Sequence, residues 1–502
     1  MTPFLWGLSM IDRLTPRLGA LAFAAMLLAG TNAAKAGPQE DAEAISQGIE
    51  GFLSLVSDQS QAIGLSHDKV SVTPDGTGFT VAVTGMRLGS GQAGLDFGEI
   101  DYRLEPQNDG TYKVGDLKLA KEMPIVGEDG KPAGTLSFDT TAFSGVWSSR
   151  LQSFLSLDWQ AKDITATSLD PKGTVAIAQA ALTAEGKDAG NNRLDETVVY
   201  TLTDVTATDP GGAPFKAAKV GGKMTLHALD FPGYRAQMAK LHDLAQKYAG
   251  TAGGAEPALT DADRAEISAV AKALPKLISG YDFTLTTDDA SGDIVSSGHV
   301  AHAEIGMALT GIDGDAASLQ VHLKQDDLTV NDPDLQKPLG QALFPKSLDL
   351  NLTFDQVPIA SATDSLAQSM TSGGAMAQDP ASLFMMTMMS ALDAAPLSLR
   401  IAPSAIETAR GRFAFDGNLA SSNGAPFGKI NVTATGLAQI VQTVEAALKD
   451  EPDAKDILDA LHEVQAAAEH ATGADGKPAD KFLLELAPDG QMQVNGKPLK
   501  AF

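Results

Sequence analysis

The sequence predicts a β-dominated α+β fold in which long antiparallel sheet is covered by a few amphipathic helices. Three observations support this fold class. Apolar and polar residues alternate along many short runs, turn-forming residues separate these runs, and few segments repeat apolar residues at helical spacing. Alternation with a period of two is typical of strands that bury one face.

The predicted strands follow one another through the whole chain. The alternating runs are residues 79–83, 117–119, 198–202, 224–226, 283–285, 319–323, 350–354, 430–432 and 484–486. Between them stand Asn108-Asp109-Gly110, Asp129-Gly130 and Asn495-Gly496, together with Pro-Asp-Gly at 74–76 and 488–490. These residues tolerate the backbone angles of tight hairpins, so neighbouring strands are expected to be antiparallel.

Four segments carry apolar stripes at helical spacing. The first stripe covers 45–56, the second covers 234–248 and the last covers 457–468. The third covers 267–278, where Thr260 can cap the helix with Asp263 three residues on, and Pro275 should bend it. Between the second and third stripes, residues 250–259 are small and nearly uncharged. They are predicted to link an N-terminal β-rich half, 37–249, to a C-terminal half, 260–502.

A short pattern recurs four times along the chain. The segments 79–86, 224–231, 350–357 and 430–437 align without gaps, with apolar residues at positions one, three and eight. The last three run on into predicted helices. Their irregular spacing excludes a solenoid of fixed period. A true repeated unit and an ordinary strand-to-helix junction remain alternatives.

The first 36 residues predict a signal peptide. Arg13 and Arg17 precede an apolar run at 18–29, and Ala34-Lys35-Ala36 follows as an A-x-A cleavage site. The run is shorter than the roughly 20 residues that span a bilayer. Cleavage after Ala36 would release a periplasmic protein. Residues 1–9 are uncharged and fit this pattern poorly, so translation starts at either Met1 or Met10.

The amino-acid composition excludes several classes of function. The net charge of −26 repels nucleic acid and anionic lipid headgroups. The chain has no cysteine, which excludes disulfides, thiolate metal sites, cysteine nucleophiles and a lipid-modified cysteine at the cleavage site. No segment after the signal resembles a transmembrane span.

Motifs that suggest catalysis or cofactor binding are better explained as structural. Residues 89–94 match G-x-G-x-x-G, but strand-like sequence follows instead of a helix, so a loop is expected. His462 and His470 lie too far apart on a helix to share a metal ion, whereas His299 and His302 would point to opposite faces of a strand. The acidic pairs and Ser66-His67-Asp68 match no complete calcium loop or triad pattern. We therefore predict no catalytic residue, no metal site and no cofactor.

The segment 379–393 is the most unusual in the chain. Asp379 and Pro380 suit a helix start, and residues 383–389 are apolar apart from Thr387. Such a helix must be buried or must contact an apolar partner. The residues that would contact an apolar ligand are Leu383, Phe384, Met385, Met386, Met388 and Met389. A plain core helix is the favoured alternative, and copper(I) capture by the methionines is a weak third reading.

The last quarter of the chain resembles a known family. After the methionine-rich segment come Ala395-Pro396-Leu397-Ser398-Leu399, the strand-to-helix segment 428–444, and a closing hairpin that ends in Val494-Asn495-Gly496. This order resembles an uncharacterised family of bacterial periplasmic proteins, a domain of unknown function, and more distantly the β-rich AsmA-like or YdgA-like envelope proteins. The AsmA-like resemblance implies lipid handling. The resemblance transfers no catalytic residues.

The leading hypothesis is therefore a non-enzymatic, soluble periplasmic protein that binds an apolar ligand or lipid in a β-sheet groove. The first alternative is a scaffold that binds another envelope protein through a sheet edge. The second is a hydrolase of envelope polymers, which would require a pocket with converging carboxylates.

Overall fold

The computed structural model is β-dominated, with far more of the described residues in strands than in helices. It describes residues 38–58, 64–90, 93–127, 129–169, 172–208, 215–249, 260–293, 297–314, 316–372, 398–422, 425–449, 455–473, 476 and 478–498. The strands in this part of the chain pair antiparallel. The predicted β-dominated, antiparallel class is therefore confirmed.

The chain forms two compact units. Unit 1 comprises Met1–Tyr281 with Ala367–Ala375, and unit 2 comprises Asp282–Leu366 with Met376–Phe502. The predicted linker at 250–259 lies outside the described residues, and its role stays a prediction. The predicted signal peptide at 1–36 also lies outside them.

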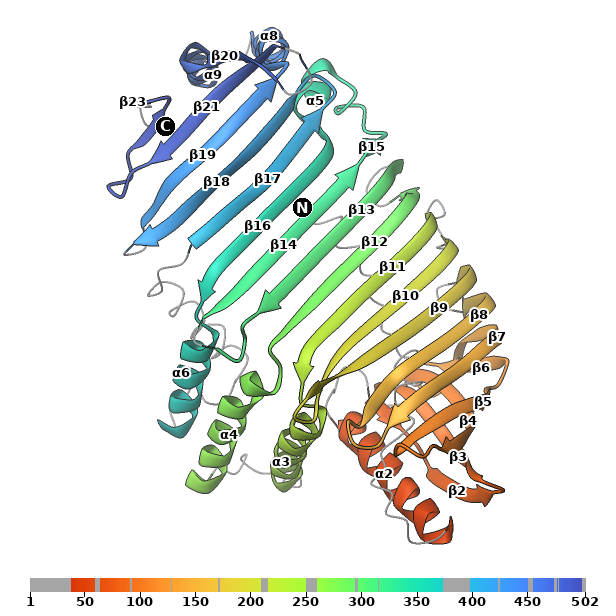
Figure 1. Cartoon of the computed structure of the whole chain (residues 1–502). Helices are drawn as coiled ribbons and strands as arrows, with labels where there is room; N and C mark the ends of the chain where they lie inside the picture. Colours follow the sequence, from red (N-terminus) through yellow and green to blue (C-terminus); the bar gives the residue numbers. More distant parts are fainter. Residues whose placement is uncertain are drawn as a thin grey trace. The chain divides into compact units, whose positions relative to one another are not determined.

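Unit 1 starts with helix α2 (Pro38–Asp58) and continues as an antiparallel meander (Figure 1). Its strands are β1 (Gly64–Ser66), β2 (Lys69–Asp75), β3 (Gly78–Ser90), β4 (Ala93–Pro106), β5 (Thr111–Lys118), β6 (Glu122–Val126), β7 (Pro132–Ser148), β8 (Ser153–Leu169), β9 (Lys172–Gly190), β10 (Arg193–Thr208) and β11 (Phe215–Leu229). At two places in the sheet, two short strands lie end to end where one long strand would otherwise be. β1 and β2 both pair with β3, and β5 and β6 both lie between β4 and β7. Helices α3 (Phe231–Ala249) and α4 (Asp261–Ala273) and the short η1 (Leu274–Leu277) follow.

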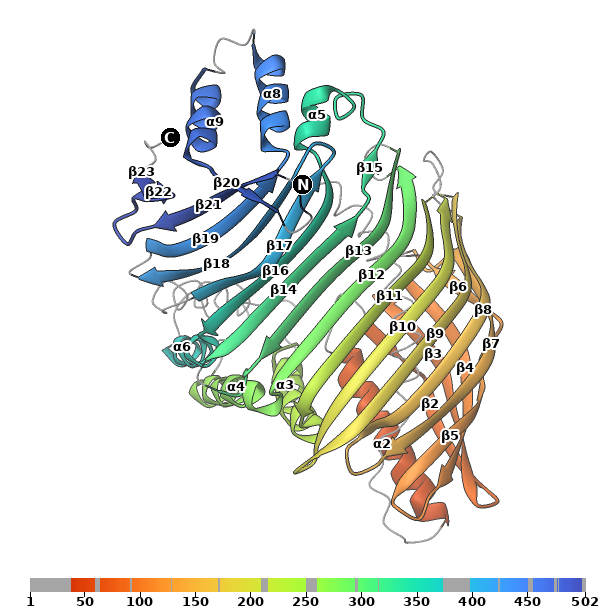
Figure 2. The same ribbon diagram turned by 45° about the horizontal axis from the view of Figure 1, so that its top comes forward.

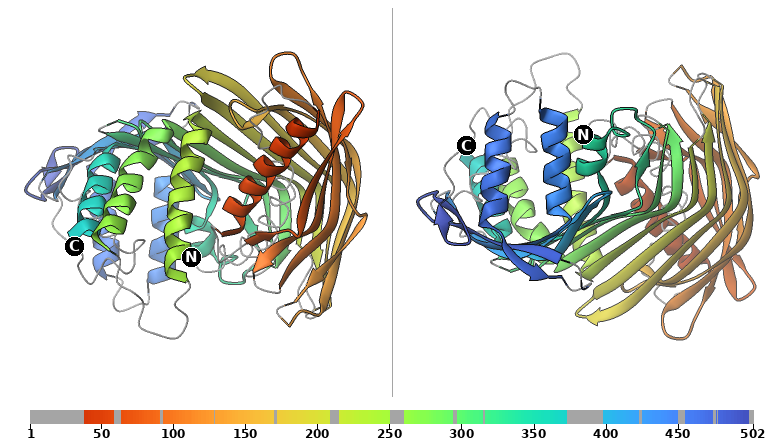
Figure 3. Two further views of the ribbon diagram at one scale, coloured as in Figure 1. Left: turned by 90° about the horizontal axis from the view of Figure 1, so that it is seen from below. Right: turned by 90° about the horizontal axis from the view of Figure 1, so that it is seen from above.

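Unit 1 has a buried core around α2 and the first strands. Helix α2 lies against β1 and β2 (Figure 3), and its Ile45 and Ile49 side chains are 0% exposed. On the strands, Val81 and Leu104 are also 0% exposed. Because the apolar stripe of α2 meets the apolar face of the strands, this part of the sheet is covered in the way that the sequence predicts.

Unit 2 is a second run of antiparallel strands (Figure 1). The elements are β12 (Gly280–Asp293), which enters from unit 1, β13 (Ser297–Thr310), β14 (Ala317–Asp326), β15 (Thr329–Val330), α5 (Pro338–Leu343), β16 (Pro345–Val357), α6 (Ile359–Ser372), β17 (Ser398–Thr408), β18 (Arg412–Ser422), β19 (Ala425–Thr435), α8 (Leu437–Leu448), α9 (Lys455–Ala467), β20 (Glu469–Thr472), β21 (Pro478–Leu486), β22 (Met492–Val494) and β23 (Lys497–Pro498). Successive pairings join β13, β14, β16, β17, β18, β19 and β21.

Helices α8 and α9 cover one end of this sheet. They stand side by side beyond β19 and β21 (Figure 2). Leu437 and Val441 of α8 pack with Ala434 of β19 and Phe482 of β21. The apolar core of unit 2 is thus concentrated at the strand ends.

Turn chemistry predicted the hairpins correctly. Asn108-Asp109-Gly110 joins β4 to β5, Asp129-Gly130 joins β6 to β7, and Asn495-Gly496 joins β22 to β23. The two Pro-Asp-Gly segments join β2 to β3 and β21 to β22. The Asp109 carboxylate accepts hydrogen bonds from both the backbone N–H and the hydroxyl of Thr111, as an Asx turn requires.

The four helices predicted from apolar stripes are also confirmed, as α2, α3, α4 and α9. Thr260 caps α4 in a full capping box with Asp263, and the helix gives way to the short η1 at Leu274, next to Pro275. The strand-to-helix junctions occur as predicted, since β11, β16 and β19 lead into α3, α6 and α8. The first aligned segment, 79–86, instead stays within β3.

Candidate functional site

The predicted ligand-contacting residues cannot be placed. Leu383, Phe384, Met385, Met386, Met388 and Met389 fall between α6 and β17, outside the described residues. Their contact with an apolar ligand stays a prediction. The described part of unit 2 offers a different apolar surface, on the sheet itself.

Apolar side chains form continuous rows across three neighbouring strands of unit 2. The pairing registers of β13, β14 and β16 align the rows Ile305–Leu323–Leu350, Met307–Val321–Leu352 and Leu309–Leu319–Phe354. Side chains two residues apart on a strand share one face, so all the rows lie on the same side of the sheet. We call this surface the apolar face. It continues onto β17, where Ile401 pairs with Leu352 and Leu399 pairs with Phe354.

The apolar face is incompletely covered. Every member of the three rows is half-buried except Met307, which is 38% exposed. Several strand residues of unit 1, such as Val81 and Leu104, are fully buried, although Met224 of β11 is 38% exposed. Burying apolar surface is worth roughly 25 cal/mol per Å², so a face left partly open forgoes stabilisation that a ligand could supply. The difference in burial makes this face the candidate binding surface.

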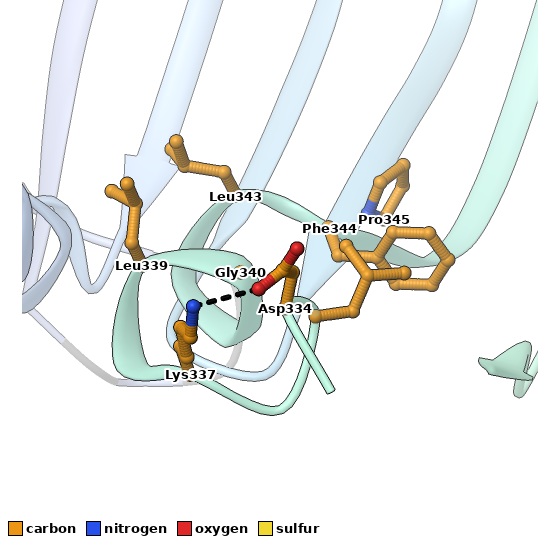
Figure 4. Close-up of a pocket in the computed structure, with 8 residues that line it drawn as sticks. Asp334, Lys337, Leu339, Gly340, Leu343, Phe344 and Pro345 are labelled. Carbon is orange, nitrogen blue, oxygen red and sulfur yellow. Dashed lines mark hydrogen bonds and ion pairs between the residues drawn. The ribbon is translucent and has the colours of Figure 1, made fainter. Parts of the chain in front are cut away.

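An apolar hollow lies at the start of β16. It encloses about 510 Å³, and Leu335, Leu339, Leu343, Phe344 and Pro345 supply most of its lining. Figure 4 shows Leu339 and Leu343 on one side and Phe344 and Pro345 on the other. Short helix α5, which carries Leu339 and Leu343, packs against α8 and β17. Leu343 is 55% exposed, so the hollow adds a further open apolar surface to unit 2.

One ion pair marks this hollow. Lys337 Nζ lies 2.7 Å from Asp334 Oδ1 (Figure 4), and this contact lowers the pKa of the Asp334 carboxyl and raises the pKa of the Lys337 amine. Both side chains are largely exposed, so the pair contributes little to stability. It gives an otherwise apolar hollow a polar, charge-neutral rim.

The opposite side of the sheet is polar. We call it the polar face, and across it runs a row of alternating carboxylates and imidazoles: Asp288, His302, Glu304, His322 and Asp349. His302 Nδ1 lies 2.7 Å from Asp288 Oδ1, and His322 Nδ1 lies 3.0 Å from Glu304 Oε1. His322 Nε2 then reaches Asp349 Oδ1 at 3.2 Å. These contacts tie neighbouring strands together on the face that water reaches.

Three other histidines each lie next to a carboxylate. His462 contacts Glu445, His470 Nδ1 lies 2.7 Å from Asp480 Oδ1, and His299 Nε2 lies 3.5 Å from Asp289 Oδ1. Within the part of the chain that the structure describes, no group of three or more such side chains is placed to hold a metal ion.

The G-x-G-x-x-G segment was expected to be a loop, but its described residues lie at the end of β3 and the start of β4. Gly89 of β3 pairs with Gly94 of β4. A Cβ on Gly89 would come within 1.8 Å of the Ala93 carbonyl oxygen. The glycines therefore permit close approach of two strands, and no helix follows to hold a phosphate.

Sequence reasoning missed one buried acid in unit 1. Glu196 of β10 is 7% exposed, and its Oε1 accepts a hydrogen bond from the Ser153 hydroxyl at 3.1 Å. Burial raises the pKa of the Glu196 carboxyl above its ordinary value, and the Ser153 hydrogen bond offsets this only in part. The residues that alternate with Glu196 on its side of the strand are apolar. The local sequence does not show that β8 will lie against its carboxylate.

No protein-family model, curated protein or solved structure matches this chain. The resemblance to a periplasmic family therefore stays a prediction. Among the described helices, none is both long and apolar enough to cross a membrane.

Proposed function

We propose that this chain is an exported, non-enzymatic envelope protein that binds an acyl chain on the apolar face of unit 2. The half-buried rows of β13, β14 and β16 carry the proposal, because their lining contains neither charged nor hydrogen-bonding side chains. A surface of this kind recognises hydrocarbon and cannot compensate the desolvation of a polar ligand. The predicted signal peptide supports export, with a mature chain that begins at Gly37.

Binding through a sheet edge has less support. The outer side of β21 is already paired, since β20 takes its first part and β22 its last. Short strands of this kind protect an edge against further pairing. The scaffold alternative therefore needs a partner that binds elsewhere on unit 2.

The first test is chemical. The full chain, purified from the periplasm without detergent, should release fatty acid or phospholipid on solvent extraction, and native mass spectrometry should show the matching mass shift. It should also bind the fluorescent fatty acid cis-parinarate. Protein that carries no lipid and does not bind cis-parinarate would contradict the proposal.

Substitutions at two adjacent positions test which face of the sheet binds the acyl chain. Met307→Lys places a charge at the exposed centre of the apolar face, so cis-parinarate affinity should fall at least about tenfold, which corresponds to about 1.4 kcal/mol. Ala308→Lys places the same charge one residue on, toward the polar face, and should leave the affinity unchanged. Equal losses in both variants would assign the binding to another surface.

A further inference from the structure

The polar face of unit 2 carries a second hollow, separate from the apolar rows. It encloses about 630 Å³ over β17, β18 and β19, and its lining includes Arg400, Asp416, Asn418, Phe427, Lys429 and Asn431. The pairing registers place Arg400 opposite Asn418 and Asn418 opposite Lys429. These side chains therefore lie in one row across the three strands. The volume is within the range of small-molecule sites.

Two polar side chains in this row are available to bind a ligand. Among the described residues, the Arg400 guanidinium and the Asn418 amide have no hydrogen-bond or ion-pair partner. Their neighbours are engaged, since Lys429 pairs with Glu485 and Asn431 Nδ2 donates to Asp416 Oδ2 at 3.0 Å. The guanidinium offers only donors, whereas the amide offers both donors and an acceptor. A ligand in the hollow would therefore find free groups of both kinds side by side.

The charges around the hollow do not favour an anion, because Glu485 adds a third carboxylate beside Lys429. Arg400 and Lys429 contribute two cations, and Asp355 and Asp416 contribute two carboxylates. The chain as a whole has a net charge of −26, which repels anions at long range. A neutral ligand with hydroxyl groups is therefore favoured over a phosphate or carboxylate, because hydroxyls both donate and accept hydrogen bonds.

An apolar surface adjoins the polar row. Phe427 pairs with Ala420 next to the β18–β19 turn, directly beyond the Asn418–Lys429 pair, and all four residues line the hollow. Phe427 is half-buried, so part of its ring remains accessible. A pyranose ring has one C–H surface that can pack on an aromatic ring and a rim of hydroxyls that can reach the polar row.

We propose that the β17–β19 hollow binds a neutral pyranose, with its ring against Phe427 and its hydroxyls hydrogen-bonded to Arg400 and Asn418. The site is distinct from the apolar face and does not depend on acyl-chain binding. The same chemistry is offered by a free sugar and by the end of a neutral polysaccharide. A longer oligosaccharide that binds more tightly than its monosaccharide would identify the polymer as the source.

Calorimetric titration of the full chain with glucose, galactose, N-acetylglucosamine and their neutral oligosaccharides tests the proposal. We expect binding of at least one of them, with a dissociation constant of the order of 1 mM. Arg400→Ala and Asn418→Ala should each weaken it about tenfold. Gln320→Ala removes an exposed amide from β14, outside the hollow, and should leave the affinity unchanged. Met307→Lys should also leave it unchanged, which separates this site from the acyl-chain site.

Three results would overturn the proposal. One is the absence of binding by every sugar of the panel. A second is sugar binding that survives both Arg400→Ala and Asn418→Ala in proteins whose circular dichroism matches the wild type. The third is tighter binding of glucuronate or inorganic phosphate than of any neutral sugar.

Discussion

Position seven of the aligned strand segments has a left-handed backbone in three of the four. Gly85, Gln356 and Gly436 have φ angles of 65°, 65° and 76°. In the remaining segment the left-handed residue is Ala228, at position five, with φ 49°. Glycine adopts this conformation without steric cost, whereas other residues are strained there. The shared alternation was visible in the sequence, but the common backbone conformation was not, because Gln356 gives no glycine signal.

Substitutions at position seven should therefore act in opposite directions. Gln356→Gly should stabilise unit 2 by up to about 1 kcal/mol, because it removes left-handed strain. Gly436→Ala should destabilise it, since a Cβ would come within 2.2 Å of the Arg410 carbonyl oxygen. Urea denaturation followed by circular dichroism checks both variants. A loss of stability in Gln356→Gly would show that this side chain has a role that outweighs its backbone strain.

Glu196 should make unit 1 less stable as pH rises. Burial raises the pKa of its carboxyl in the folded state, so the folded state holds the proton more tightly than the unfolded state. The destabilisation is absent below the unfolded pKa and complete above the folded pKa. Glu196→Gln keeps an acceptor for Ser153 and should raise the thermal midpoint at about pH 7 but not at about pH 4. An equal effect at both pH values would contradict this account.

At the scale of elements, local patterns predicted the strands and helices well. The alternation at 319–323 and 350–354 identified β14 and β16, and the stripe at 45–56 identified α2. Which strands meet could not be read locally. Leu309, Leu319 and Phe354 form one row because of pairings that depend on the whole sheet. The partial exposure of that row could not be predicted from the sequence either. An alternating strand has the same sequence pattern whether or not its apolar side is covered.

Matched leucine truncations can measure this difference in coverage within unit 2. Leu437 of α8 is 7% exposed, whereas Leu350 of β16 is half-buried. Leu437→Ala should cost about 2–5 kcal/mol, and Leu350→Ala should cost roughly half as much. Hydrogen exchange of the unit 2 amides measures the loss of stability in both variants. A Leu350→Ala cost as large as that of Leu437→Ala would show that the apolar face is packed as tightly as the core.

At the scale of the whole molecule, each unit treats its apolar strand surface differently. Unit 1 buries part of this surface under α2, with Ile45 and Ile49 fully covered, and leaves Met224 of β11 38% exposed. Unit 2 concentrates its core under α8 and α9 and leaves the apolar face half-buried. Overall charge does not distinguish these arrangements, because acids fill the polar positions throughout the chain. We therefore propose that unit 2 binds the ligand and that the core of unit 1 is structural.

The most direct test of this assignment is site-specific photo-crosslinking in the periplasm of living cells. A benzophenone amino acid at position 307 should capture a radiolabelled acyl chain, because this site is the exposed centre of the apolar face. The same probe at position 308, on the polar face, should capture none. A probe at position 307 that captures only protein, or acyl chains captured equally from both positions, would contradict acyl-chain binding on the apolar face.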